Sequence, residues 1–114
     1  MVVDDDPALL DELEQILVQE EFEVETVNQS VFKQIIERSD PDLILIDVWF
    51  GKNPDGMTMT QALRSSRQLH DVPIILMSSD GLIANYSAKV GADTYLEKPL
   101  DVDELLFTIN SLVN

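Results

Sequence analysis

Four short apolar runs in this 114-residue chain each stop at polar side chains that could take part in chemistry. In chain order the runs end at Asp4 and Asp5, at Asp47, at Ser78 and at Lys98. Three carboxylates brought close together cannot all stay ionised without a compensating cation, and Mg²⁺ prefers carboxylate, water and phosphate oxygens. A hydroxyl and an ammonium group beside them could hold the oxygens of a phosphoryl group on Asp47. If the fold gathers these residues, the pattern favours phosphoryl transfer to a carboxylate.

The elements that must position these residues alternate between strand and helix five times. Strands are expected where apolar residues run together or alternate, and helices where they recur at helical spacing. Apolar and polar residues alternate strictly along 23–27, which fits an edge strand with one face exposed to solvent. Segments 43–46 and 73–77 are apolar on both faces, which is typical of buried parallel strands. The expected strands are 1–3, 23–27, 43–46, 73–77 and 94–97, and the expected helices are about 6–20, 31–36, 58–69, 82–90 and 105–113.

This alternation predicts a single α/β domain over residues 1–114, with a parallel sheet, helices on both faces and right-handed crossovers. In open sheets of this kind, binding sites form outside the carboxyl ends of the strands, where the polar residues stand. Local signals support the helix ends, since Asp6 can cap the first helix and Pro7 suits its first position. Gly91 fits the end of the helix at 82–90. The second helix depends on a stripe formed by Val31, Phe32, Ile35 and Ile36.

Composition and charge exclude several classes of function. Seven Lys and Arg residues against 22 Asp and Glu residues give 7 − 22 = −15, which disfavours direct contact with nucleic acids and anionic membranes. The absence of cysteine excludes disulfides, a thiolate zinc site and a cysteine nucleophile. No apolar run approaches the roughly 20 residues that span a membrane, and no signal peptide is visible, so a cytoplasmic location is expected. His70 has no metal-ligand companions and is expected at the surface.

Over essentially its whole length, the sequence resembles a response-regulator receiver domain, the phosphoacceptor of two-component signal transduction, of the type found in chemotaxis regulators. No single dipeptide is specific, but the matches occur in the right order at the right strand ends. The resemblance implies a flavodoxin-like, doubly wound sheet of five parallel strands in the order 2-1-3-4-5. The matching segments are Val2-Val3-Asp4-Asp5, Leu45-Ile46-Asp47-Val48, Ser78 after the strand at 73–77, Gly91-Ala92-Asp93 and Lys98-Pro99.

The resemblance also implies a role for each matching residue. Asp47 would be the residue that is phosphorylated, and Ser78 and Lys98 would bind the phosphoryl oxygens. Ser78 and Tyr95 would form the switch pair, and the peptide bond before Pro99 would be cis. The indole of Trp49 would border the path of the water that hydrolyses the acyl phosphate, and is expected to slow that hydrolysis. The Mg²⁺ ligands would be Asp4, Asp5, Asp47 and the backbone carbonyl of Trp49.

Four departures from the family pattern affect the loops and the first strand. The first strand has only three residues before the acidic pair, about two fewer than usual. Gly51 stands where a proline is usual, and the loop from Asp47 to Gly56 is one residue longer. Between Ser78 and Gly91 the chain is about two residues shorter, so the fourth helix is expected to be reduced or irregular. These changes affect the signalling face more than the chemistry.

The leading hypothesis is therefore a phosphorylation switch that takes a phosphoryl group from a sensor histidine kinase or a phosphotransfer protein. Such a chain is not a classical enzyme, although it takes part in its own phosphorylation and dephosphorylation. Its partner downstream would be another protein or a fused output domain, and no output domain is recognised within these residues. The alternative is a receiver-like binding module that is not phosphorylated. A haloacid-dehalogenase-type phosphatase is disfavoured, because it needs a second aspartate two residues after the nucleophile, where this chain has Trp49.

Overall fold

The structure is a computed structural model that describes residues 1–28 and 31–113, without the side chain of Ile35. The part of the expected second-helix stripe that depends on Ile35 therefore lies outside the described residues. Five strands alternate with helices, as the sequence predicts. The elements are β1 (Val2–Val3), α1 (Pro7–Gln19), β2 (Thr26–Val27), α2 (Phe32–Ile36), β3 (Ile44–Asp47), α3 (Asp55–Arg64), β4 (Ile74–Ser78), α4 (Ile83–Tyr86), the 3₁₀ helix η2 (Ala88–Val90), β5 (Thr94–Glu97) and α5 (Val102–Val113).

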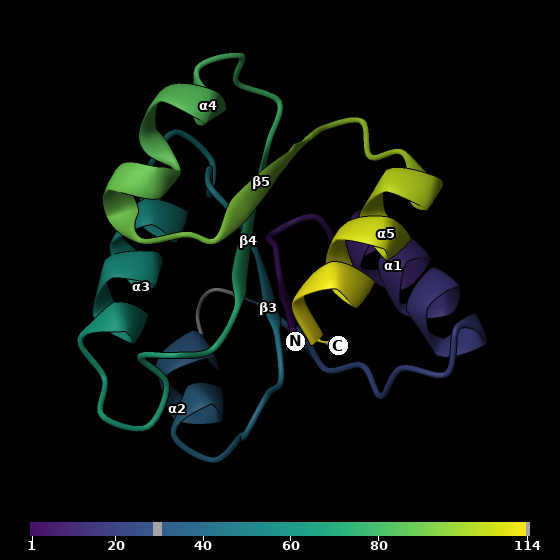
Figure 1. The fold of residues 1–114 in the computed structure, drawn as a ribbon, viewed down its shortest axis with the longest axis horizontal. Coiled ribbons are helices and arrows are strands. Elements are labelled where there is room, and N and C mark those ends of the chain that lie inside the picture. Colours follow the sequence, from purple (N-terminus) through teal and green to yellow (C-terminus); the bar gives the residue numbers. More distant parts are fainter. Residues whose placement is uncertain (29–30, 114) are drawn as a thin grey trace.

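The strands form one parallel sheet in the order β2-β1-β3-β4-β5. Helices α1 and α5 cover one face, and α2, α3 and α4 cover the other (Figure 1). This arrangement confirms the doubly wound, flavodoxin-like fold. Because β1 and β3 are neighbours, the order of strands reverses between them, and the residues that follow these two strands stand side by side.

Alternate residues of the central strands build two hydrophobic layers. In β3, Ile44 and Ile46 join the layer that contains Phe32 of α2, Leu63 of α3 and Ile83 of α4. Leu45, between them, joins the opposite layer with Leu13 and Leu17 of α1 and Leu105 and Ile109 of α5. Strands β3 and β4 are buried along their whole length, because helices lie on both faces and strands on both sides.

The second strand is shorter than the expected 23–27. It does lie at the edge of the sheet, but exposure alternates only over 23–26, because Val27 is buried directly after the partly buried Thr26, and only these two residues pair with β1. A strand needs a partner to complete its ladder, and β1 offers only Val2 and Val3. The short first strand therefore also shortens the second one.

Three helices differ from their expected bounds. Helix α5 begins at Val102, three residues before the expected start at 105. Helix α3 occupies 55–64 instead of 58–69: it begins at Asp55, and after Arg64 the backbone N–H of Ser65 turns back to Gln61 and Ala62. The fourth helix is reduced, as expected, to the single turn of α4 followed by η2. Gly91 ends η2 with φ = 94°, in the left-handed region that glycine adopts readily. Asp6 caps α1 by accepting hydrogen bonds from the N–H groups of Ala8 and Leu9, which confirms the predicted cap.

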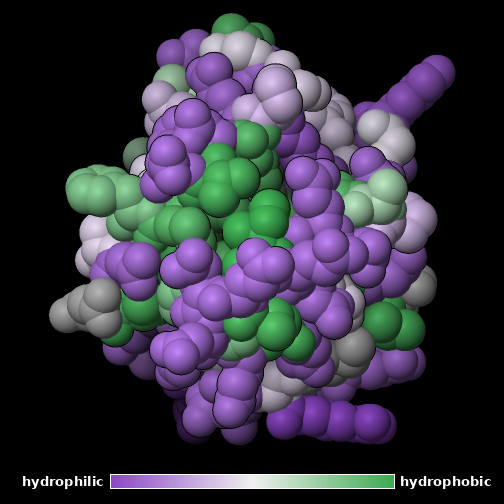
Figure 2. Space-filling view, turned by 90° about the vertical axis from the view of Figure 1, so that its right-hand side faces the viewer, coloured by the Kyte–Doolittle hydropathy of each residue, from purple (hydrophilic) through white to green (hydrophobic). Residues whose placement is uncertain are grey.

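The face that carries α1 and α5 has hydrophobic side chains gathered in its middle and hydrophilic ones around them (Figure 2). Between the two helices a groove of about 280 Å³ is lined by Leu9, Leu13 and Ile16 on one side and Leu100, Val102 and Leu105 on the other. Within the described part of the chain, no helix combines the length and the apolar character needed to cross a membrane.

Candidate functional site

The three predicted carboxylates meet at the carboxyl ends of β1 and β3. Val3 pairs with Ile46, so the next residue on each strand brings Asp4 beside Asp47. One carboxylate oxygen from each of Asp4, Asp5 and Asp47 lies within 4.8 Å of the other two. Asp4 and Asp47 are buried and Asp5 is exposed, so the cluster opens to solvent on the Asp5 side. Among the described residues this is the one group of three or more potential metal ligands.

Lys98 joins the cluster from the end of β5. Its ammonium donates to Asp4 Oδ2 at 2.9 Å and to Asp47 Oδ1 at 3.0 Å, which ties residues from three separate strand ends together. Burial alone would lower the pKa of Lys98, but the hydrogen bonds to Asp4 and Asp47 outweigh it and leave the pKa raised. The peptide bond between Lys98 and Pro99 is cis, as the resemblance implies.

Asp47 sits in an environment that disfavours its charge. Burial raises the pKa of this carboxyl to about 6; the hydrogen bond from Lys98 opposes the shift, and the neighbouring Asp4 adds to it. A single ammonium group does not compensate three carboxylates. A divalent cation would, so the electrostatics of the cluster fit a site for a hard metal ion.

The free oxygens of the cluster also fit a metal ion. Asp4 Oδ1 accepts from the backbone N–H of Asp6 at 3.0 Å, and Asp5 Oδ2 accepts from Gly51 N–H at 3.2 Å. Among the described hydrogen bonds, Asp5 Oδ1, Asp47 Oδ2 and the Trp49 carbonyl have no donor, which leaves three oxygens for a cation. Gly51 reaches its position with φ = 63°, which gives a physical reason for glycine at this departure from the family pattern.

Gly56 lets the first turn of α3 lie directly against the end of β3. Its N–H donates to the Val48 carbonyl at 3.0 Å. A Cβ at this position would overlap the Asp47 carbonyl and would meet Val48 Cα at 2.8 Å. Glycine is therefore required for the close approach that fixes the backbone of Asp47, a role that a loop glycine in the sequence does not reveal.

The other predicted site residues lie around the cluster at different depths. Ser78 is buried at the end of β4, directly after Met77, which pairs with Asp47. Its hydroxyl accepts a hydrogen bond from Asp80 N–H at 2.9 Å. Tyr95 lies on β5, where it pairs with Leu76 of β4. Both Tyr95 and Trp49 are partly buried against the hydrophobic layer beneath α2, α3 and α4. His70 is exposed, as expected.

The structure gives a role to two residues that the sequence analysis did not single out: Arg64 holds the end of α3 that lies away from the site, and Tyr86 lies near the site. Arg64 donates to the carbonyls of Gly91 and Val72, each at 2.6 Å, and pairs with Asp93 at 2.7 Å, so it joins α3 to the loops that flank β4 and lead into β5. Tyr86, the last residue of α4, lies partly buried near Ser78. A lone arginine or tyrosine on a helix gives no local signal of either role.

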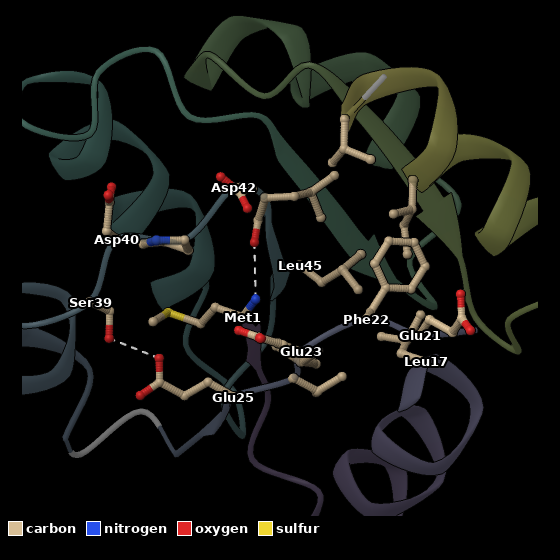
Figure 3. Close-up of a pocket in the computed structure, with 16 residues that line it drawn as sticks. Met1, Leu17, Glu21, Phe22, Glu23, Glu25, Ser39, Asp40, Asp42 and Leu45 are labelled. Atoms are coloured by element: carbon tan, nitrogen blue, oxygen red, sulfur yellow. Dashed lines mark hydrogen bonds between the residues drawn. The ribbon is translucent and has the colours of Figure 1, made fainter. Parts of the chain in front are cut away.

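A cavity of about 750 Å³ lies at the other end of the sheet (Figure 3). There the Met1 ammonium donates to the Leu43 carbonyl at 3.0 Å, and the Ser39 hydroxyl donates to Glu25 at 2.8 Å. None of its lining residues belongs to the carboxylate cluster. The chemical site is therefore the acidic cluster at the carboxyl ends of the strands, not this cavity.

Comparison with known proteins gives the same family on sequence and on fold. The family described as response regulator receiver domain matches residues 1–110. The DNA-binding dual master transcriptional regulator RpaA of Synechocystis is 32% identical over 99% of this chain and 48% of that protein, so the chain spans about half the length of the curated relatives it matches. A putative response regulator from Chloroflexus aurantiacus is 25% identical, with a TM-score of 0.89 over 98% of this chain and 93% of that one.

A further solved structure matches the fold alone. It is the receiver domain of the sensor histidine kinase PA1611 from Pseudomonas aeruginosa, with a magnesium ion coordinated in its active-site cleft. It is 24% identical and has a TM-score of 0.86 over 98% of this chain and 93% of that one. With the family match over nearly the whole chain and the acidic cleft at the strand ends, this chain belongs to the response-regulator receiver domains.

Proposed function

We propose that this chain is a phosphorylation switch in which Asp47 accepts a phosphoryl group from a phosphohistidine of a sensor histidine kinase or phosphotransfer protein. The observation that carries the proposal is the meeting of Asp4, Asp5 and Asp47 at one cleft, with Lys98 bonded to two of them. Membership in the receiver family supports it. Residues 1–114 would act as one phosphoacceptor domain.

The chemistry assigned to Asp47 follows from the hydrogen bonds of its two oxygens. Lys98 holds Oδ1, so Oδ2 is the oxygen that attacks the phosphorus atom. The new O–P bond forms as the P–N bond to the histidine breaks, and the electron pair returns to the imidazole nitrogen. Lys98 and the Ser78 hydroxyl then bind the oxygens of the phosphoryl group on Asp47. Hydrolysis by water later releases phosphate and restores the carboxylate, so no external metabolite is turned over.

The metal ion assigned to the cleft is Mg²⁺. Asp5 and the Trp49 carbonyl supply oxygens without a donor, and Asp4 and Asp47 complete the acidic set that would hold the ion. When bound, Mg²⁺ would neutralise the charge on the phosphoryl oxygens during transfer. The magnesium ion in the cleft of the PA1611 receiver supports this choice of metal.

Ser78 and Tyr95 would couple phosphorylation of Asp47 to a change at the surface of the domain. A phosphoryl group draws the Ser78 hydroxyl towards it, which frees space for the partly buried Tyr95 ring to turn inward. The surface of α4, β5 and α5 would change as a result, and a downstream protein or an output domain would read that change. The equilibrium shifts because the phosphoryl group interacts differently with the two states. The cellular location we propose is the cytoplasm.

The proposal is tested with acetyl phosphate as a small phosphodonor, with and without Mg²⁺, followed by intact mass measurement. We expect one added phosphoryl group that requires Mg²⁺ and is absent from Asp47→Asn. The matched control is Asp103→Asn, which removes an exposed carboxylate on α5 and should be phosphorylated like the wild type.

An adduct that persists in Asp47→Asn would contradict the assignment of the phosphoacceptor. No adduct in wild-type protein, under conditions where Mg²⁺ binding is demonstrated, would instead favour the receiver-like binding module. In that case Ser78 and Lys98 would serve only to hold the cleft together.

A further inference from the structure

Tyr86 carries a hydroxyl that is buried without a partner. Among the described residues it is the one buried side-chain nitrogen or oxygen that has no hydrogen-bond partner. Burying a hydroxyl without a hydrogen bond is costly, so native structures rarely leave such a group unpaired without a reason. The unpaired group lies beside the candidate site, which makes a ligand-dependent partner the first explanation to consider.

The shortened connection after β4 brings Tyr86 to this place. Ser78 accepts from Asp80 N–H at 2.9 Å, and Asp80 in turn accepts from Leu82 N–H at 2.8 Å, so two consecutive side-chain bonds tighten the turn. Helix α4 starts at once, at Ile83, which is completely buried, and lasts a single turn. Its last residue, Tyr86, therefore ends up over the same layer as Trp49.

The polar groups around the Tyr86 hydroxyl belong to the site. Burial raises the pKa of this phenol; nearby Ser78 and Trp49 act against the shift as hydrogen-bonding groups, and the charges of Asp80 and Asp47 add to it. The hydroxyl thus keeps its proton at neutral pH and lies near Ser78 and Trp49, two of the residues predicted to form the site. Neither Ser78 nor Trp49 lies in hydrogen-bonding geometry with the Tyr86 hydroxyl.

We propose that the Tyr86 hydroxyl is a hydrogen-bond donor to the phosphoryl group carried by Asp47. The inference rests on the proposed function and adds a ligand to it, beside Ser78 and Lys98. A phosphoryl group brings three acceptor oxygens into the cleft, and one of them can satisfy a donor that has no partner while Asp47 is unmodified. The unpaired hydroxyl then stabilises the phosphorylated state at the expense of the unmodified one.

This role differs from that of Tyr95, which would respond to Ser78 by movement of its ring. Tyr86 would contact the phosphoryl group directly and would need no large movement. The single-turn α4 would then be coupled to phosphorylation through its last residue. The switch would therefore include a direct bond from the reacting centre to α4.

The test uses Tyr86→Phe in the 114-residue chain and beryllofluoride with Mg²⁺ as the probe of the phosphorylated state. Phenylalanine keeps the packed ring and removes only the hydroxyl. We expect beryllofluoride to bind the variant about tenfold more weakly or worse, as for a lost hydrogen bond to a charged group. The melting temperature of the unmodified variant should be unchanged or slightly higher, because an unpaired buried hydroxyl has been removed.

Two further variants make the result decisive. Ser87→Ala removes the hydroxyl of the buried residue next to Tyr86 and should bind beryllofluoride like the wild type. In a Ser78→Ala background, Tyr86→Phe should still weaken binding; no further effect would mean that Tyr86 acts only through Ser78 and would overturn a direct contact.

Equal affinity in wild type and Tyr86→Phe would also overturn the inference, as would weaker binding that parallels a lower melting temperature. Wild-type protein that binds Mg²⁺ but no beryllofluoride would instead contradict the proposed function, and the inference with it. The failure of one is thus distinguished from the failure of the other.

Discussion

At the scale of single residues, the pKa of Asp47 makes the stability of the protein depend on pH. The folded pKa of about 6 lies above the unfolded value of 3.8, so the native state holds the proton more tightly between these two values. Stability due to this group is therefore greatest below about pH 4, falls as pH rises to 6, and stays low above it. The charge on buried Asp47 thus destabilises the metal-free protein at neutral pH.

Asp47→Asn removes this dependence. In metal-free buffer we expect the variant to gain about 2–3 kcal/mol relative to wild type between pH 4 and pH 7, from the size of the shift. Urea unfolding of both proteins in EDTA at several pH values measures the difference, with Asp103→Asn as control. A difference that does not change with pH would show that burial does not raise this pKa.

A second residue-scale prediction concerns Trp49. Its partly buried indole lies near the hydroxyl of Tyr86, and the family resemblance places it beside the path of water to the acyl phosphate, which it should restrict. Trp49→Asn should shorten the lifetime of the phosphorylated protein by about tenfold, equivalent to a barrier change of about 1.4 kcal/mol. Loss of the phosphoryl group over time, followed by intact mass, measures this, and an unchanged lifetime would be evidence against the role of the indole.

At the scale of the elements, Arg64 connects α3 to the segments around β4 and β5. Its guanidinium donates to three backbone carbonyls and to Asp93, and Asp93 also accepts from the N–H of Ile74 at 2.8 Å. The guanidinium offers five N–H donors spread over a fixed planar fork, so it reaches acceptors in different directions that the compact ammonium of lysine cannot reach together. The end of α3 thus depends on one side chain as well as on its backbone.

Arg64→Lys should therefore lower the free energy of unfolding by about 2 kcal/mol, because about two hydrogen bonds are lost. Urea unfolding checks this against Arg67→Lys, which changes an exposed arginine three residues later. Phosphorylation by acetyl phosphate should continue in Arg64→Lys, since Arg64 does not contact the carboxylate cluster. Equal stability of the two variants would contradict the bridging role.

At the scale of the whole molecule, the net charge of −15 and the acidic cleft predict stabilisation by Mg²⁺. A ligand that binds only the folded state at about 100 times its Kd adds about 2.7 kcal/mol. We expect Mg²⁺ to raise the melting temperature more than NaCl of equal ionic strength does. Most of the excess should vanish in Asp5→Asn and persist in Asp11→Asn; an equal response to both salts would indicate screening alone.

The sequence by itself determined the alternation of strands and helices, the buried central strands and the polar residues at the strand ends. These features depend on local periodicity and on caps such as Asp6, which neighbouring residues decide. The order of strands came from the resemblance, and the structure confirms it. The gathering of Asp4 and Asp47 follows from that order, because β1 and β3 are neighbours.

Only the tertiary structure decided the remaining features, because each depends on contacts between distant residues. Thr26 and Val27 form the whole of β2 because β1 offers no further partner. Gly56 matters because a carbonyl nine positions earlier lies against it. Arg64 and Tyr86 acquire their surroundings from loops and strand ends that no local pattern specifies. The sequence thus predicted which groups could do the chemistry, and packing decided which others surround them.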